Sequence, residues 1–168
     1  MEAGAPAVLA LRQRLDELMR LVGELPADAY RARPSRVSGS VGEHVRHVLD
    51  HVSSLVAGGP SEVLTYDHRM RGTAVETEPH AAVCEMARLD AALERWAEQP
   101  LDESVAVAAL LSANGRSITG RSTLVRELAF VMSHTIHHQA IVALLLERQG
   151  APVPGGGFGY APSTPAPN

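Results

Sequence analysis

Residues 130–145 read FVMSHTIHHQAIVALL and place three histidines in an otherwise apolar segment. Imidazoles buried among apolar side chains cost free energy unless their nitrogens have partners. Residues in and around this segment recur at intervals of three, four and seven, which is typical of one buried face of a helix: Leu128, Val131, Thr135, Val142 and Leu145. The stretch therefore predicts a core helix whose histidines need a use for their lone pairs or protons.

This helix has clear boundaries in the sequence. Ser122 or Thr123 can cap its first turn, and Gly150 follows its last periodic residue, with Pro152 beyond. Three other segments show the same period, and each has its own start or stop signal. We expect them to form helices over residues 6–23, from the Ser40–Glu43 capping box to about Ala57, and from Pro79 to about Gln99.

Four amphipathic helices predict an all-α fold, an antiparallel four-helix bundle. Residues 61–78 show no clean period and are expected to be a long, ordered connection with one helical turn. Val105–Ser112 and Arg116–Thr119 flank the sequence Ala-Asn-Gly and are expected to form a small β-hairpin before the last helix. We therefore predict one domain over residues 1–154, followed by a Gly- and Pro-rich tail over 155–168.

Composition argues against several classes of function. The chain has 45% hydrophobic residues and a formal net charge of −4, whereas binding to nucleic acid favours a basic face. It contains no run of 18 apolar residues, so we expect no membrane span. The single cysteine, Cys84, cannot form an intramolecular disulfide and fits a reducing cytoplasm. It lies at helical spacing among small apolar residues, so we expect a packed side chain.

A helical wheel gives the histidines of the last helix unequal positions. At 100° per residue, His138 falls within about 40° of the centre of the apolar stripe, and His134 lies about 40° further round. His137 falls roughly 100° beyond His138, near the boundary with solvent. His134 and His138 are thus an i, i+4 pair that leans inward, and such a pair can grip one transition-metal ion.

Two ligands seldom hold a metal alone, and the helix after Ser40 offers three more candidates. The wheel for this helix places His44 and His51 closer to its valine stripe than His47, which lies further round on the same flank. An inward position favours His44 or His51, whereas a half-open site in a groove of the bundle favours a flank position. All three histidines therefore stay candidates on helical geometry.

The sequence SVGEHVRHVLDH at residues 40–51, followed much later by SHTIHHQAI at 133–141, resembles the DinB-like superfamily of metal-binding four-helix bundles. In that family one ligand is a histidine seven residues after the helix-starting serine, and His-x-x-x-His on the last helix supplies two more. The resemblance covers almost the whole chain in the order and length of its helices. It implies His47, His134 and His138 as metal ligands, with His44 and His51 as neighbouring contacts to the ligands or a substrate.

The resemblance also implies a range of activities. Members include thiol-dependent S-transferases that use bacillithiol or mycothiol and a mycothiol-dependent maleylpyruvate isomerase, and related bundles form part of iron-dependent sulfoxide synthases. Three neutral imidazoles leave a metal its full 2+ charge and open coordination positions, which suits catalysis better than a sealed structural site. The first hypothesis is a small metal-dependent transferase or hydrolase that activates a thiol or water against a small substrate.

The long connection is the expected source of further groups at such a site. Tyr66, Arg69 and Arg71 lie close together in the sequence YDHRMRG, and either arginine can clamp a substrate carboxylate. A solvated loop with internal salt bridges is an equally good interpretation. His137, near solvent, is expected to support the site and not to ligate.

Other interpretations of the histidines remain open. One is a non-catalytic metal-binding or dimerising bundle that acts as an adaptor or sensor, and another is a polar network without metal.

The residue types do not identify the metal, because nickel, zinc and iron all bind to imidazole ligands. The sequence EHVRH at residues 43–47 is not the His-Glu-x-x-His motif of zinc proteases, and the paired Glu-x-x-His motifs of di-iron centres are missing. The expected partners are a small substrate, such as a low-molecular-weight thiol, and a second copy in a homodimer.

Overall fold

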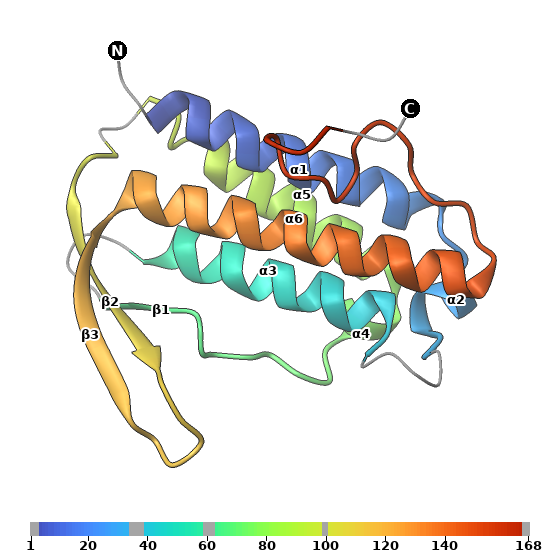
Figure 1. Ribbon diagram of the computed structural model, residues 1–168, viewed down its shortest axis with the longest axis horizontal. Helices are drawn as coiled ribbons and strands as arrows, with labels where there is room; N and C mark the ends of the chain where they lie inside the picture. The colour runs from blue at the N-terminus through green and yellow to red at the C-terminus, as the bar shows by residue number, and fades with distance from the viewer. Residues whose placement is uncertain (1–3, 34–38, 59–62, 99–100, 166–168) are drawn as a thin grey trace.

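The computed structural model describes residues 4–33, 39–58, 63–98 and 101–165. Over these residues the chain is mostly helical and carries one three-stranded sheet (Figure 1). The predicted, mainly helical fold with a small hairpin is therefore confirmed in outline, and the sheet has one strand more than the hairpin. In chain order the elements are α1 (Gly4–Glu24), α2 (Ala27–Arg31), α3 (Val41–Ala57), β1 (Val63–Thr65), α4 (Ala74–Thr77), α5 (Pro79–Glu94), β2 (Ser104–Leu110), β3 (Ser117–Thr123) and α6 (Leu124–Gln149).

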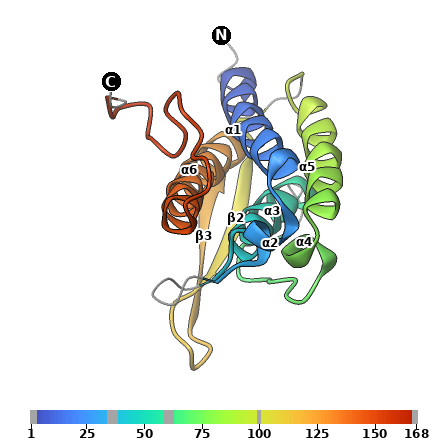
Figure 2. The same cartoon turned by 90° about the vertical axis from the view of Figure 1, so that its right-hand side faces the viewer.

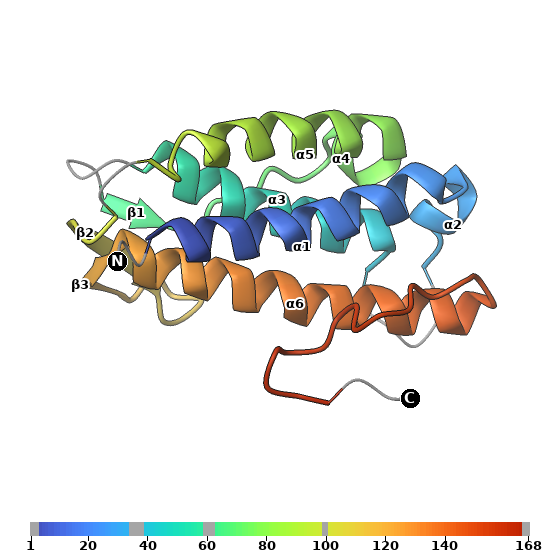
Figure 3. The same cartoon turned by 90° about the horizontal axis from the view of Figure 1, so that it is seen from above.

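The long helices α1, α3, α5 and α6 lie side by side and enclose the core (Figures 2 and 3). α1 packs against α5 and α6, and α3 packs against the same two helices. Each helix turns a stripe of apolar side chains inward, and these residues are fully buried: Leu15 on α1, Val45 on α3, Met86 on α5 and Leu128 on α6. Removal of this apolar surface from water is the main source of stability for such a fold.

The predicted helix boundaries agree with the hydrogen bonds at the helix ends. At the start of α3, the backbone N–H of Glu43 donates to Ser40 Oγ at 3.2 Å, and the N–H of Ser40 donates to Glu43 Oε2 at 2.8 Å. At the start of α6, the N–H of Arg126 donates to Thr123 Oγ1 at 3.3 Å. α6 ends at Gln149, and the next residue, Gly150, adopts a φ of 67° that a side chain would strain. The capping box and the last helix were thus predicted correctly.

The third predicted helix begins at Pro79, as expected, but α5 ends at Glu94. Its predicted end at Gln99 lies outside the described residues. Cys84 is exposed, contrary to expectation. The register of α5 turns Ala82, Met86 and Leu89 inward, and this leaves residue 84 on the opposite face.

The sheet has the strand order β1-β2-β3 and projects from one end of the helices (Figure 1). β2 and β3 form the predicted hairpin, with Ala108 opposite Thr119. β3 is longer than expected and runs directly into α6. β1 was not predicted, because it has three residues and pairs in parallel with the distant β2, with Leu64 opposite Val107.

α6 is long and apolar enough to cross a membrane by length and composition alone. The core helix of a soluble protein passes the same test. α6 supplies fully buried residues such as Val131 and Leu145 to the packed interior, so its apolar character has a use within the domain.

The tail beyond α6 returns along the body of the protein (Figure 3). Phe158 is buried against the core, with 6% of its surface exposed. A Cβ atom at Gly159, which has a φ of 76°, would lie 2.7 Å from the backbone nitrogen of Ala140 in α6. Glycine at this position allows the tail to approach the helix closely.

Candidate metal centre

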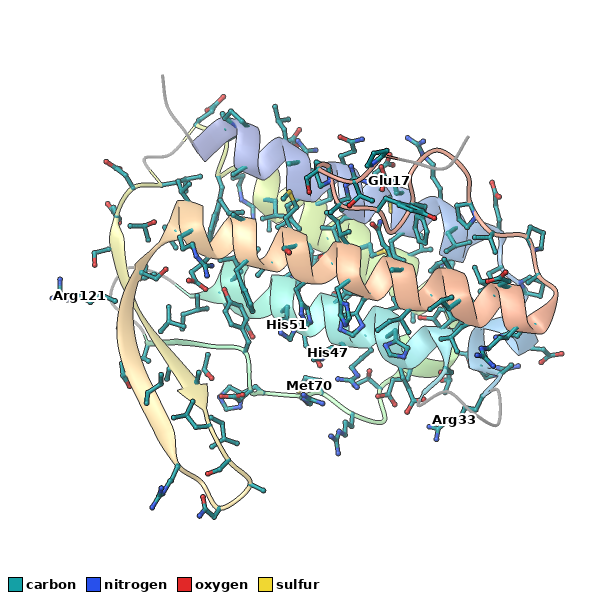
Figure 4. All side chains as sticks on the ribbon, in the orientation of Figure 1. Glu17, Arg33, His47, His51, Met70 and Arg121 are labelled. Atoms are coloured by element: carbon teal, nitrogen blue, oxygen red, sulfur yellow. The ribbon has the colours of Figure 1, made fainter. Side chains whose placement is uncertain are left out.

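α3 and α6 bring five histidines into one cluster. His44, His47 and His51 come from successive turns of α3, while His134 and His138 come from adjacent turns of α6. The two helices pack against each other, and His47 and His51 project from α3 toward α6 (Figure 4). The candidates that the sequence placed on two distant segments thus meet in the fold.

His47 and His134 form the centre of this cluster, with ring centroids 5.0 Å apart. His138 contacts both of them, at 4.8 Å from His47 and 4.5 Å from His134. His51 also contacts both, at 4.5 Å from His47 and 4.0 Å from His134. The central pair therefore has two histidine neighbours, one from each helix.

Two ring nitrogens of the central pair have no hydrogen-bond partner among the described residues. They are His47 Nδ1 and His134 Nε2, and both atoms are buried. A buried polar atom without a partner costs about 1–3 kcal/mol, so such atoms are rare unless a ligand satisfies them. A metal ion between the two rings would use these lone pairs.

His51 is held in one tautomer by the backbone. Its Nδ1 lies 3.0 Å from the carbonyl oxygen of His47, and because a carbonyl can only accept, this nitrogen carries the proton. Nε2 is then the nitrogen with a lone pair. Tyr66 stacks on the same ring, with centroids 5.1 Å apart and ring planes within 6° of parallel, which fixes its orientation further.

His138 and His44 contact each other directly. Their Nδ1 atoms are 3.0 Å apart, so one nitrogen donates its proton to the other. The Nε2 atom of His138 takes no part in this hydrogen bond. His44 thus orients the His138 ring, which is the kind of support that metal-ligating histidines commonly receive.

One ring nitrogen from each of His47, His51 and His134 lies within 4.8 Å of the other two, a spacing at which three imidazoles can converge on one ion. The sequence predicted His47, His134 and His138 as ligands. The central pair is common to both sets, and the sets differ only in whether His51 or His138 is the third member. The full predicted set stays a prediction.

Burial keeps the clustered imidazoles neutral. Together with the neighbouring histidines and the Arg69 charge, burial lowers the pKa of His47 to about 3 and that of His134 to about 4, and burial is the largest cause for both. Burial also lowers the pKa of His51 and His138. Because only a neutral imidazole has a lone pair to donate, the cluster is ready to bind a metal at neutral pH.

A cavity of about 400 Å³ opens beside the cluster. His47, His51 and His134 line one part of it, and β2, the loop after β1 and the first turns of α6 line the rest. Further lining residues are Tyr66, Asp67, Arg69, Val107, Ala108, Ala109, Arg126, Glu127 and Phe130. A metal held by the cluster would therefore adjoin a space of the size that small molecules occupy.

Glu127 ties three elements together at the edge of this cavity. Only 6% of its surface is exposed. The hydroxyl of Tyr66 donates to Glu127 Oε2 at 2.9 Å, and the hydroxyl of Ser122 donates to Glu127 Oε1 at 2.6 Å. The loop after β1, the end of β3 and the first turn of α6 are thus linked through one carboxylate.

The structure separates the predicted supporting residues into two groups. Tyr66 and Arg69 line the cavity, whereas Arg71 is exposed and is not among its lining residues. His137 is exposed, as the wheel predicted, with its ring 5.3 Å from that of His138.

Sequence reasoning missed Arg126, Glu127 and Phe130 at the cavity. These residues precede His134 by eight, seven and four positions on α6. Residues four, seven and eight positions apart share one face of a helix, so following the His134 face toward the N-terminus of α6 identifies these residues.

A larger, mainly apolar hollow of about 780 Å³ lies elsewhere, between the end of α1, α2 and the tail. Its lining includes Leu21, Leu25 and Phe158 and none of the histidines. The smaller cavity has the chemically capable side chains, so we place the candidate site there.

Of the comparisons with known proteins, the one with family models agrees with the histidine cluster. The family model described as the DinB family matches residues 8–160, and the chain belongs to this family. FK506-binding protein 5 from Rhizopus delemar is 31% identical over 103 residues, which cover 61% of this chain and 26% of that protein. The match thus spans about a quarter of the length of that relative. No solved structure matches the chain significantly.

Proposed function

We propose that this protein is a small divalent-metal-dependent enzyme built on an antiparallel four-helix bundle, which activates a thiol or a water molecule against a small substrate. The proposal depends above all on one observation: the buried His47 Nδ1 and His134 Nε2 have no partner among the described residues, and both histidines border a cavity. Membership of the DinB family and the histidine group support a divalent metal at this place.

The proposed ligands are His47, His134 and His138. His138 contacts both members of the central pair, and His44 orients it through Nδ1. A set of neutral imidazoles suits nickel, zinc or iron. Such a metal would act as a Lewis acid toward a thiol or water at its open position.

The protein's own groups would then handle the proton and the substrate. His51 is anchored through Nδ1, so its Nε2 is the atom that can accept a proton from the thiol or water. Tyr66 stacks on His51 and keeps this ring in place. Val107 and Phe130 add apolar surface to the cavity, which disfavours bulk water near the reacting groups.

Metal analysis of protein purified without a histidine tag tests the site. We expect about one equivalent of a divalent metal in the wild-type protein after reconstitution and well under one in His47→Ala and His134→Ala. His80→Ala, an exposed histidine at the start of α5, is the matched control and should keep its metal. Less than stoichiometric metal in the reconstituted wild-type protein would overturn the proposal and favour a polar network.

A non-catalytic adaptor or sensor is the alternative, and the cavity beside the cluster argues against it. Titration of the cobalt-loaded protein with a low-molecular-weight thiol separates the two. An enzyme with an open metal position should develop a sulfur-to-cobalt charge-transfer band, whereas a closed, fully coordinated metal should not. We also expect a homodimer formed through helix faces, which sedimentation analysis of the reconstituted protein would test.

A further inference from the structure

Two arginines at the cavity beside the cluster have unused hydrogen-bond donors. Arg69 comes from the loop after β1, and Arg126 comes from the first turn of α6. Among the described residues, neither guanidinium forms an ion pair or a side-chain hydrogen bond. The Arg126 guanidinium lies 5.9 Å from the centre of the Phe130 ring, and the Arg69 charge acts on the rings of the central histidine pair.

Both carboxylates at the cavity already accept hydrogen bonds from other groups of the protein. Both oxygens of Glu127 accept hydrogen bonds from hydroxyl groups. Asp67 Oδ2 accepts the backbone N–H of Leu110 at 2.7 Å and joins the loop to β2. Both guanidiniums therefore keep unused donors, whereas both carboxylates are already engaged by groups of the protein, and this difference favours an anionic ligand.

The remaining walls are apolar. Val107, Ala108 and Ala109 come from β2, and Phe130 comes from α6. The Phe130 ring lies 5.2 Å from that of Tyr66, and together they form an aromatic surface. A volume of about 400 Å³ falls at the lower end of the range of about 300–1,000 Å³ for small-molecule sites.

We propose that the cavity beside the histidine cluster binds a small carboxylate-bearing substrate, with Arg69 and Arg126 on the carboxylate and a short apolar or aromatic body against β2 and Phe130. The forked donors of arginine match the two oxygens of a carboxylate. The inference rests on the proposed function for its chemistry, because the reacting end of such a substrate would face the metal. Recognition itself depends only on side chains of the protein.

Calorimetric titration with benzoate and its neutral isostere benzamide tests this inference on the metal-loaded protein. We expect benzoate to bind at least about tenfold more tightly than benzamide, since only the carboxylate can form charge-assisted hydrogen bonds to both guanidiniums through two anionic oxygens. Arg69→Gln and Arg126→Gln should each weaken benzoate about tenfold and leave benzamide unchanged. Arg121→Gln, on exposed β3, is the matched control and should bind benzoate like the wild type.

Two further measurements keep the outcomes distinct. Metal content and thermal melting of each variant verify that the site and the fold are intact. Benzoate titration of metal-free His134→Ala tests whether the arginines act without the metal, and we expect binding that still depends on Arg69. Equal affinity for benzoate and benzamide, or benzoate binding that needs the metal but not the arginines, would overturn the inference. Absence of metal from the wild-type protein would instead count against the proposed function.

Discussion

The Nδ1–H of His51 donates to the carbonyl oxygen of His47, 3.0 Å away, and this hydrogen bond leaves Nε2 as the free nitrogen of a ring that contacts the central histidine pair. His138 contacts the same pair but bonds to His44 through its own Nδ1. His51 and His138 are thus both candidates for the third metal ligand, and alanine substitutions at the two positions distinguish them.

If His138 is the third ligand and His51 a proton acceptor, the two alanine variants should differ. His138→Ala should lower metal affinity by more than about 100-fold, whereas His51→Ala should lower it by at most about tenfold, in the range for residues that only support a ligand. Competition with a chromophoric chelator measures both affinities. The reverse order would make His51 the ligand.

The neutral histidines make the stability of the metal-free protein depend on pH. Folding lowers the pKa of His47 from 6.5 to about 3 and that of His134 to about 4, so the unfolded chain binds more protons between these limits. Stability is therefore fully present above about pH 6.5 and falls as the pH drops toward 4. Urea unfolding at pH 7 and pH 5 should show this loss of stability. The loss should be smaller in His47→Gln, because about one proton fewer binds on unfolding. An equal loss in both proteins would contradict the prediction.

The hydrogen bonds of Glu127 should contribute measurably to stability. In Glu127→Gln, an amide N–H₂ replaces one acceptor oxygen and meets a hydroxyl that was donating to it, so we expect a loss of about 1–3 kcal/mol in the free energy of unfolding. Glu98→Gln changes an exposed carboxylate and should stay within about 0.5 kcal/mol of the wild type. Urea unfolding of the two variants at pH 7 gives the comparison, and similar values for both would contradict the expectation.

Close packing around α3 predicts that replacing Gly42 by alanine strongly lowers the free energy of unfolding. A Cβ atom there would lie 2.1 Å from the carbonyl oxygen of Glu76 and 2.6 Å from Cε1 of Tyr30. Gly42→Ala should therefore cost about 3 kcal/mol or more, because α3 would have to move away from α2 and α4.

Gly23, in the last turn of α1, is the control for this substitution. No atom lies within 4 Å of a Cβ built on Gly23, so Gly23→Ala should be neutral or stabilise the protein by up to about 1 kcal/mol. Thermal melting of both variants measures the difference. A mild effect at Gly42 would show that the elements around it can shift at low cost.

Much of this fold is encoded locally. Helical periodicity, the capping box at Ser40 and the stop at Gly150 act over a few residues, and each helix that they predicted is present. β1 lacks such a signal, because its hydrogen bonds go to a strand some forty residues away. Its pairing depends on how the chain folds back, which no local pattern records.

The candidate site shows the same division. The i, i+4 spacing identified His134 and His138 as candidate ligands. The choice of His47 on α3 as their partner followed from the family resemblance. A wheel could not show that His51 stacks on Tyr66, since this contact depends on the path of the loop. Arg126 escaped notice for a similar reason: its role depends on β2 and the loop, which complete the cavity from outside α6.

Thr123 is both the last residue of β3 and the residue that caps α6. The projecting hairpin and the helix that carries His134 therefore follow each other directly, with no connecting loop between them. The first turn of α6 comes immediately after this junction, and it supplies Arg126 and Glu127 to the lining of the cavity. One wall of the cavity thus starts at a strand-to-helix junction, so the chain order itself places β2, through its partner strand β3, and the histidine-bearing helix around one space.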